Sequence, residues 1–456
     1  MNYLKMKSSI VLFYLLFISF YSVAQHQKAQ KPNILIILTD DLGSQDLSYY
    51  GKRDIRTPNI DSLARSGMRF DRFYANSPVC SPTRASLLSG RYPEMVGVPG
   101  LVRSKPEDNF GYLKPDAVLL PKLLKQAQYN TAIIGKWNLG LEAPNTPNKK
   151  GFDFFHGFLD DMMDDYWTHL RNGKNFMREN EKEIYPQGHA TDIFSDWAVE
   201  YIQKQKNSKN PFFLYLAYNA PHFPVQPPAE WLAKVKAREP GISDKRTKLV
   251  ALIEHLDNGI GNVIRTLKET GVYDNTLIVF LSDNGGHLEE EGYNGTLRDG
   301  KQSVYEGGLR IPAFFVWANQ IKAGSVSKQI ALTMDIYPTI SEITGAKINH
   351  KIDGVSLLPV LRNPVEKLIE RPVFFTRREG NPRYGGQTIQ AVISDNWKLL
   401  QNSPFSPYEL YNLSDDPLEK QNLISSHGDQ VKRLQQLLIK QIQKGGSVPW
   451  QKLEND

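Results

Sequence analysis

The chain has 456 residues, of which 40% are hydrophobic, and it carries a formal net charge of +6 at pH 7. This length and composition predict a large globular core, with one main domain and a smaller appendage. A net positive charge this small over so long a chain is not typical of a nucleic-acid-binding protein, which would carry a strongly basic surface. The single cysteine, Cys80, excludes an internal disulfide.

Residues 1–24 have the features of a secretory signal peptide. Lys5 and Lys7 form a charged region, residues 10–20 are apolar, and residues 22–24 form a small-residue cleavage site. The apolar run is short for a membrane span, and no cysteine follows it to carry a lipid anchor. We therefore expect a mature chain that begins near Gln25, lacks a membrane anchor, and is exported to the periplasm or the exterior.

Four apolar runs rich in β-branched or aromatic residues predict buried strands of a mostly parallel sheet. They are residues 33–38 (NILIIL), 131–134 (TAII), 212–218 (FFLYLAY) and 276–281 (TLIVFL). Helical patterns alternate with these runs. One begins at Pro58, with Thr57 as its N-cap and Gly67 past its end, and another covers residues 248–269. The alternation predicts an α/β sandwich whose large sheet is flanked by helices.

Each predicted strand is followed by a charged or metal-competent side chain. These are Asp40 and Asp41 after the first strand, Lys136 after the second, His222 after the third, and Asp283 and Asn284 after the fourth. Ligands of open α/β sheets bind beyond the carboxyl ends of the strands. A single such residue is typical of an ordinary polar loop, but four strand ends together predict one converging site.

The segment VCSPTRASLLSGRYP, residues 79–93, contains the only cysteine. A lone cysteine is most often a small buried apolar residue. Here Pro82 favours the first turn of a helix that ends near Gly90, so Cys80 is expected at an anion-binding helix N-terminus. Arg84 lies one turn further on. The combination predicts a site for a sulfate- or phosphate-like group.

The residues at the strand ends also predict a metal ion. Asp40, Asp41, Asp283 and Asn284 offer only oxygen ligands, which suit a hard cation such as Ca²⁺ or Mg²⁺. A zinc pair would call for histidines at these positions. Three carboxylates crowded together without a metal would repel one another.

Several segments resemble motifs of one known family. The segment CSPTR followed by ASLLSGRYP resembles the signature of the type I sulfatases of the alkaline-phosphatase superfamily, in which a maturing enzyme oxidises the cysteine to Cα-formylglycine (3-oxoalanine) before export. Other segments similar to family motifs follow in order: NILIILTDDLG, TPNIDSLARSG, IIGKWNLG, APHFP, LSDNGG and GKQSVYEGGLRIP. With WKLL and YELYNLSDDPLEKQNL near the C-terminus, the resemblance covers Lys31 to Leu423.

The resemblance implies a role for each of these residues. It implies that one divalent ion, usually calcium, is held by Asp40, Asp41, Asp283, Asn284 and the modified Cys80. It also implies that the sulfate ester is surrounded by Arg84, Lys136, His222 and Lys301. An oxygen of the hydrated aldehyde would attack sulfur, the cations would neutralise charge on the sulfuryl group, and His222 or Lys301 would protonate the departing oxygen. The second diol hydroxyl would then lose its proton, and sulfate would leave as the aldehyde re-forms.

One position departs from the family pattern. The usual segment reads GKWHLG, whereas this chain reads GKWNLG with Asn138 in place of the histidine. In the family, that histidine hydrogen bonds the diol and is thought to accept the proton in the last step. Asparagine can form a hydrogen bond but cannot act as a base near neutral pH. A different base, or slow release of sulfate, is therefore expected.

The chain changes character after DIYPTISEITG, near Gly345. We therefore predict a catalytic domain over residues 25–345 and a smaller C-terminal part over residues 346–456. The strand-like segments PVFFTRR, IQAVISDNWKLL and YELYNL precede a final helix rich in Gln, Leu and Lys. They predict a small antiparallel sheet packed with that helix.

Two segments outside the motifs are candidates for substrate recognition. Residues 157–173 mix four aspartates with Trp167 and His169, and residues 376–387 contain Arg377 and Arg378. Aromatic rings can stack on sugars, and arginines can hold a further anionic group. Each segment is equally compatible with an ordinary surface loop.

The sequence thus predicts hydrolysis of a sulfate ester on a carbohydrate, namely an oligosaccharide from a sulfated polysaccharide. The first alternative is a phosphate or phosphonate monoester hydrolase of the same superfamily, which Asn284 and the maturation motif disfavour. The second is a sulfated-glycan-binding protein with an impaired site, for which Asn138 is the only support.

Overall fold

The computed structural model describes residues 31–105, 108–379 and 387–445. The predicted signal peptide lies outside these residues. Within them, a ten-stranded sheet has the order β12-β2-β11-β10-β1-β9-β3-β4-β7-β8. In that order the strands span Ser325–Leu332, Met68–Tyr74, Ala313–Val316, Thr276–Ser282, Asn33–Thr39, Phe212–Ala217, Asn130–Lys136, Phe154–Phe158, Met177–Glu179 and Lys182–Glu183.

The four strands predicted from the sequence are confirmed, and they are neighbours. They form the parallel centre of the sheet in the order β10-β1-β9-β3. The antiparallel pairs of this sheet, β10 with β11, β11 with β2, β4 with β7 and β7 with β8, lie at the margin of that centre or beyond it. The sheet is therefore mostly parallel at the place where the predicted site residues emerge.

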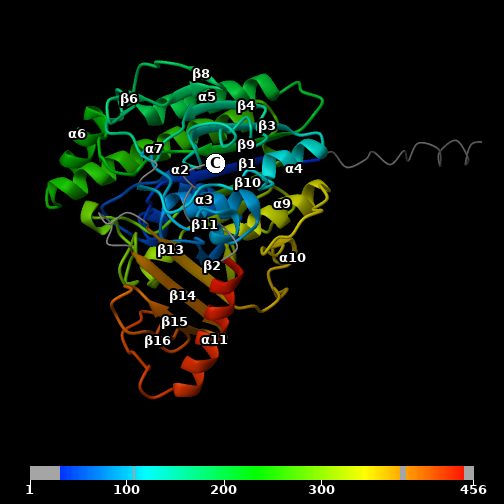
Figure 1. Cartoon of the computed structure of the whole chain (residues 1–456). Helices are drawn as coiled ribbons and strands as arrows, with labels where there is room; N and C mark the ends of the chain where they lie inside the picture. The colour runs from blue at the N-terminus through cyan, green and yellow to red at the C-terminus, as the bar shows by residue number, and fades with distance from the viewer. Residues whose placement is uncertain (1–30, 106–107, 380–386, 446–456) are drawn as a thin grey trace, which may run out of the picture.

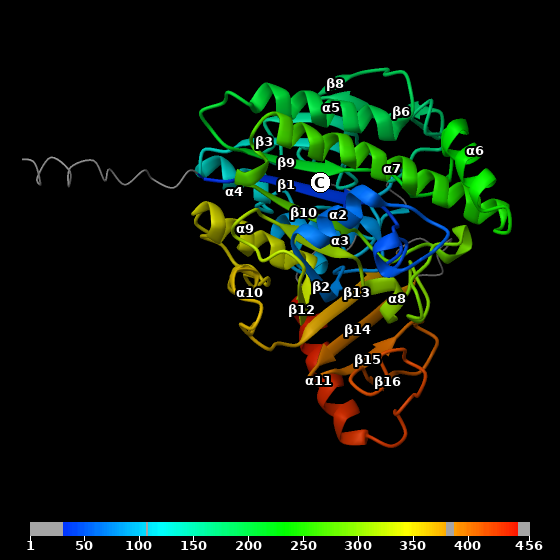
Figure 2. The ribbon, with the colours of Figure 1, turned by 180° about the vertical axis from the view of Figure 1, so that it is seen from behind.

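Helices cover both faces of this sheet (Figures 1 and 2). The α-helices of the described residues are α2 (Pro58–Ser66), α3 (Cys80–Ser89), α4 (Leu120–Gln126), α5 (Ala190–Gln205), α6 (Ala229–Arg238), α7 (Asp244–Glu269), α8 (Glu306–Leu309), α9 (Ile336–Thr344), α10 (Leu358–Arg362) and α11 (Gly428–Gly445), the last of which packs on the C-terminal sheet instead. The expected helices at residues 58–66 and 248–269 correspond to α2 and α7.

Alternate residues of β1 explain the two layers. Ile34, Ile36 and Leu38 belong to one apolar cluster, whereas Leu35 and Ile37 belong to another on the opposite face. Successive strand residues point to opposite faces, so a strand buried on both sides reads as a continuous apolar run. Helices α3, α4 and α9 pack on the first face, and α2, α5 and α7 pack on the second.

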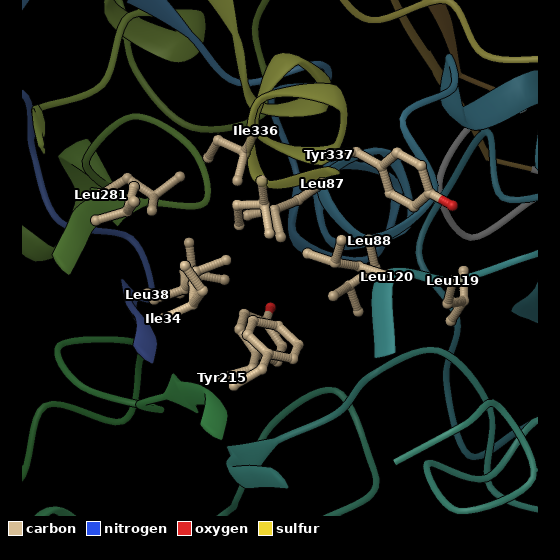
Figure 3. Packing of buried hydrophobic residues seen from close by; sticks show 14 of the residues in the cluster. Ile34, Leu38, Leu87, Leu88, Leu119, Leu120, Tyr215, Leu281, Ile336 and Tyr337 are labelled. Carbon is tan, nitrogen blue, oxygen red and sulfur yellow. The ribbon is translucent and has the colours of Figure 1, made fainter. Parts of the chain in front are cut away.

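Helix α3 is anchored between the sheet and α9. Leu87 and Leu88 lie between the strand residues Leu38 and Tyr215 and the α9 residue Ile336 (Figure 3). All ten residues of α3 are buried. The helix begins at Cys80 and ends before Gly90, whose φ of 68° is the left-handed conformation that glycine adopts readily. The position predicted for Cys80, at a helix N-terminus, is confirmed.

A second, four-stranded antiparallel sheet follows near the C-terminus. Its order is β13-β14-β15-β16, with the strands at Val373–Arg378, Thr388–Ser394, Trp397–Gln401 and Glu409–Asn412. Helix α11 packs on it through Leu434 and Leu438. A two-stranded sheet of β5 (Leu170–Arg171) and β6 (Lys174–Asn175) lies apart from both. The predicted small sheet and its helix are confirmed, while the domain boundary at residue 345 stays a prediction.

None of the helices within the described residues combines the length and the apolar character needed to cross a membrane.

Candidate active site

The carboxyl ends of the central strands lie side by side. Thr39 at the end of β1 pairs with Ser282 of β10, and Leu38 pairs with Ala217 of β9. The residues at this edge are Asp40 and Asp41 after β1, Lys136 at the end of β3, His222 after β9, and Asp283 and Asn284 after β10. The structure thus brings together the side chains that the strand-end pattern predicted to converge.

Cys80 is buried at the same edge. Its Sγ lies 3.2 Å from Asp40 Oδ1 and 3.7 Å from Asn284 Oδ1. Burial, reinforced by the negative charges of Asp283 and Asp40, raises the pKa of the Cys80 thiol well above its ordinary value. Burial of this kind disfavours the thiolate, which is the nucleophilic form of an unmodified cysteine. The surroundings therefore fit a position whose chemistry depends on modification.

Arg84 and Lys136 face two of the carboxylates. Arg84 donates from Nε and Nη2 to Asp283 Oδ2 at 3.2 and 2.7 Å, and Lys136 Nζ lies 2.5 Å from Asp40 Oδ2. Burial alone would raise the pKa of Asp40, but Lys136 and other nearby cations hold it below its ordinary value. Burial, followed by the charge of Asp40, raises the pKa of Asp283 to about 7. The two carboxylates thus differ in how firmly each is held ionised.

Lys301 and His222 face the third carboxylate. Lys301 Nζ lies 2.6 Å from Asp41 Oδ2, and His222 Nε2 lies 3.6 Å from the same oxygen. Asp41 has a φ of 66°, a left-handed conformation that Asp tolerates better than most residues. Its backbone N–H donates to Asp283 Oδ1 at 3.2 Å. The turn after β1 is therefore tied to the end of β10.

The donor set at this edge fits a divalent cation. Asp40, Asp41, Cys80 and His222 each offer a ligand atom within 4.8 Å of the others. Asn284 adds an amide oxygen beside Cys80, and its Nδ2 donates to Asp41 Oδ1 at 2.8 Å. Carboxylate and amide oxygens are the ligands that hard cations prefer. These residues can therefore hold a divalent metal ion.

Asn138 lies beside the beginning of α3. Its Nδ2 donates to Val102 O at 2.8 Å, and the Val102 N–H donates to Ser81 Oγ at 2.9 Å. Within the described part of the chain, the buried Oδ1 of Asn138 has no hydrogen-bond partner. A buried amide oxygen without a partner is costly, so Oδ1 is available to accept a hydrogen bond from a bound group.

The segment 157–173 contains residues in contrasting surroundings. Trp167 is 48% exposed, and its ring packs edge-on against His189. His169 is buried, and its Nε2 lies 3.0 Å from Gly188 O. Trp167 is therefore accessible to a ligand, whereas His169 is engaged in the local packing of this segment.

Arg377 and Arg378 end β13 and are both buried. Arg377 donates from Nε to Glu379 Oε1 at 3.0 Å and from Nη1 to Gln302 Oε1 at 3.3 Å. The chain neighbour of Gln302 is Lys301, so the Arg377 side chain reaches the turn that carries a predicted catalytic lysine. The Arg378 N–H donates to Pro99 O at 2.9 Å.

Asp160 is a candidate that the sequence did not single out. It follows β4, which was not among the predicted strands, and its carboxyl group is buried. Its neighbour Leu159 accepts a hydrogen bond from the Asn138 N–H at 3.0 Å. Burial, followed by the charge of Asp161, raises the pKa of Asp160 to about 7. The strand-end pattern would have found Asp160 if β4 had been recognised.

The chain is similar in sequence to known proteins. The chain matches the sulfatase family over residues 32–346 and the C-terminal region of N-sulphoglucosamine sulphohydrolase over residues 297–446. It is 34% identical over 391 residues to N-acetylgalactosamine-6-sulfatase of Sus scrofa, in a match that covers 81% of this chain and 71% of the relative. It is 31% identical over 506 residues to a sulfatase of Formosa agariphila, with 94% and 91% covered.

A solved structure is also similar. The structure of Ps i-CgsB in complex with k-i-k-neocarrahexaose superposes with a TM-score of 0.83 at 33% identity, covering 93% of this chain and 96% of that one. The fold and the converging site define an enzyme that hydrolyses esters of an anionic group. The chain belongs to the sulfatase family and is a sulfuric ester hydrolase.

Proposed function

We propose that this sulfatase removes sulfate from a carbohydrate, namely an oligosaccharide derived from a sulfated polysaccharide. The observation that carries the proposal is the position of Cys80, buried at the start of α3 beside Asp40 and Asn284. Support for a glycan substrate comes from the similar structure that holds a carrageenan-type oligosaccharide.

Residue 80 is proposed to act after a maturing enzyme has oxidised it to formylglycine. The proposed ion is Ca²⁺, since its ligands would be Asp40, Asp41, Asp283 and Asn284 with the modified residue. Once hydrated, residue 80 would supply a diol oxygen that attacks sulfur, and the ion would polarise the sulfate oxygens.

Arg84 and Lys136 are proposed to bind the sulfate oxygens. Arg84 places its planar guanidinium one helical turn after residue 80, and its Nη1 also donates to Lys136 O at 3.3 Å. This contact ties the guanidinium to the end of β3. Donors fixed in this way stabilise charge that develops on the sulfuryl group without needing to reorient.

His222 and Lys301 are proposed to serve the departing alcohol. Both approach Asp41 Oδ2, so they lie on one side of the cluster. Lys301 is charged and can donate a proton to the sugar oxygen as the bond from sulfur to oxygen breaks. Burial, followed by the charge of Lys301, lowers the pKa of His222 to about 4, so His222 would serve as the acid only when the negative charge of a bound sulfate ester raises that pKa. Asn138 is proposed to hold a bound oxygen through a hydrogen bond but not to act as a base.

Substrate recognition is proposed to involve residues beyond the cluster. The exposed Trp167 ring can stack on a sugar, and Arg377, which reaches the Lys301 turn through Gln302, can hold a further anionic group. His169 and Arg378 are proposed to position these two segments rather than contact the sugar. Residues 1–24 are proposed to direct export to the periplasm or the exterior.

The test is to produce the full chain with a formylglycine-generating enzyme and assay a panel of defined sulfated oligosaccharides. We expect sulfate release from at least one of them, loss of sulfur at residue 80 by peptide mass spectrometry, and no turnover by Cys80→Ala. Full activity with an intact thiol would contradict the modified nucleophile. Faster hydrolysis of phosphate monoesters than of every sulfated sugar would favour the phosphatase alternative, and binding without turnover would favour the glycan-binding alternative.

A further inference from the structure

A cavity of about 560 Å³ lies between the edge of the large sheet and the C-terminal sheet. One wall comes from Arg72 of β2 and from residues 328–330 of β12. The other comes from the connection 367–371, from Val373 at the start of β13, and from residues 393–396. Its volume is in the range typical of small-ligand sites, and it includes none of the residues of the catalytic edge.

Positive side chains dominate this cavity. Arg72, Lys328 and Lys367 line it, and within the described residues none of the three pairs with a carboxylate at ion-pair distance. Arg371 also lines the cavity, but its Nη2 is bound to Asp335. Two carboxylates, Glu370 and Asp395, line the cavity as well, and Asp395 is bound to Arg433 at 2.9 Å. Among the described residues, the lining therefore holds three cations outside ion pairs against one such carboxylate, which leaves an excess of positive charge.

Arg72 has one nitrogen with a hydrogen-bond partner and one without, within the described residues. Its Nη1 donates to Asn396 Oδ1 at 2.6 Å, which fixes the guanidinium against the turn between β14 and β15. Its Nη2 is buried and, within the described residues, has no hydrogen-bond acceptor. Leaving a buried charged donor without a partner is unfavourable. Because Arg72 lines the cavity, a turn of its side chain toward the cavity would give this nitrogen an anionic acceptor there.

The backbone holds the two lysines at this place. The register between β12 and β2 shifts between Ser327 and Ile330, so Lys328 and Gln329 lie in a β-bulge. Bulges redirect side chains at sheet edges. Gln329 accepts from the Leu368 N–H and donates to Glu366 O at 2.6 Å, which ties the Lys367 connection to the bulge. Figure 2 shows this connection running from α10 to β13.

We propose that this cavity is a second binding site for the sulfate groups of a sulfated glycan, separate from the catalytic site. This inference rests on the proposed function, because the substrate polymer carries the anionic groups that the cavity would take. Val373 lines the cavity, and Arg377 lies four residues further along the same strand, roughly 13 Å at ~3.3 Å per residue. Binding one polymer chain at two sites raises its apparent affinity.

The test measures binding of dextran sulfate, with unsulfated dextran as a reference, to the full chain carrying Cys80→Ala so that no turnover occurs. The cavity variant is Arg72→Gln/Lys328→Gln/Lys367→Gln. The matched control, Lys122→Gln/Lys209→Gln/Lys440→Gln, removes the same charge from exposed positions elsewhere. Because each cation can form a charge-assisted hydrogen bond, we expect the cavity variant to bind about tenfold more weakly and the control to bind normally.

Further results also test the proposal. An equal loss of affinity in both triple variants, or no loss in the cavity variant, would overturn the proposal. The exposed single change Lys328→Glu should weaken binding without lowering the melting temperature, which separates loss of the site from loss of the fold. In the enzyme with residue 80 intact, the cavity variant should keep the kcat of a short monosulfated substrate. Failure to desulfate any glycan would instead contradict the proposed function, and the binding measurement would still test the cavity.

Discussion

Two clusters of buried charged residues, the junction cluster and the catalytic cluster around Cys80, differ in the partners that surround their charges. The junction cluster consists of Glu306 in α8, Lys398 in β15, Glu419 and Tyr74, and it lies where the large sheet meets the C-terminal sheet. Lys398 Nζ lies 3.0 Å from Glu306 Oε1 and 2.8 Å from Glu419 Oε1. Tyr74 donates to Glu306 Oε2 at 2.9 Å, and the Glu306 N–H donates to Glu419 Oε2 at 2.7 Å. The chain itself supplies partners to each of these charged groups.

The catalytic cluster is built differently. Its carboxylates and cations surround Cys80. The carboxylates come from the ends of separate strands, and the cations come from a strand end, helix α3 and the turn before α8. Near it, the Asn138 Oδ1 has no hydrogen-bond partner among the residues that the structure describes. Buried charge is therefore not sufficient to indicate a functional site. What distinguishes the catalytic cluster is its convergence on a potential nucleophile at the carboxyl edge of a parallel sheet.

The largest expected effect is a loss of folding stability when the junction cluster is broken. Lys398→Met leaves Glu419 without its cation and leaves Glu306 with only Arg310, whose Nε lies 3.6 Å away. Breaking a buried ion pair in this way costs about 3–5 kcal/mol. Denaturant unfolding should show this loss. Adding Glu419→Gln should recover part of it, because one of the two charges is then removed. Lys149→Met, which breaks the exposed pair with Glu181, should cost less than about 1 kcal/mol. Equal losses from both lysine variants would show that the ion pairs of the junction cluster contribute no more stability than an exposed pair.

The next largest effect is a loss of turnover when the catalytic cluster is altered. Arg84→Met should lower kcat by roughly a hundred- to a thousandfold, because removing one fixed donor from a developing negative charge has effects of this size. Arg84→Lys should lose less, since it keeps the charge but not the planar fork. Steady-state kinetics on a sulfated sugar measures both. A kcat within threefold of the wild type for Arg84→Met would remove Arg84 from the mechanism.

Metal removal should affect only the catalytic cluster. Chelation should lower both activity and melting temperature, because an ion that binds only the folded state stabilises it by about 2.7 kcal/mol at one hundred times its Kd. Calcium should restore both better than zinc does. Lys398→Met should keep this calcium response, whereas Asp41→Asn should lose it. Restoration by zinc alone would contradict the proposed ion.

The central strands and the convergence of the site could be predicted because their signals are local. A strand buried on both faces must be apolar throughout, and the residue after it must lie at the sheet edge, so the amino-acid pattern alone places Asp40 and Asp283. Asp160 was missed because β4 is short and its sequence, FFHGF, includes His156 and Gly157. The cationic cavity depends on distant segments, with Arg72 and Asn396 separated by 324 positions, and no local pattern reports such a contact.

The smallest expected effect concerns Asn138, which stands where the family pattern has a histidine. In the proposed mechanism, attack on sulfur uses groups that this chain carries, so only the release of sulfate is expected to be slow. The wild-type enzyme should then show a rapid initial release of alcohol before slower steady turnover. Asn138 has a φ of 57°, which histidine also tolerates, so Asn138→His should fold.

Asn138→His should speed the slow step. Positioned bases contribute about a hundredfold or more, but the natural enzyme must already use another group for this proton, so we expect a gain in steady turnover of about tenfold. Asn138→Gln, which keeps an amide without a base, should give no gain. Rapid-quench kinetics measures the initial phase of each enzyme. If the wild type shows no initial phase and the histidine variant is slower, the free Oδ1 of Asn138 serves substrate recognition, because a hydrogen-bond acceptor would then have been lost without any need for a base.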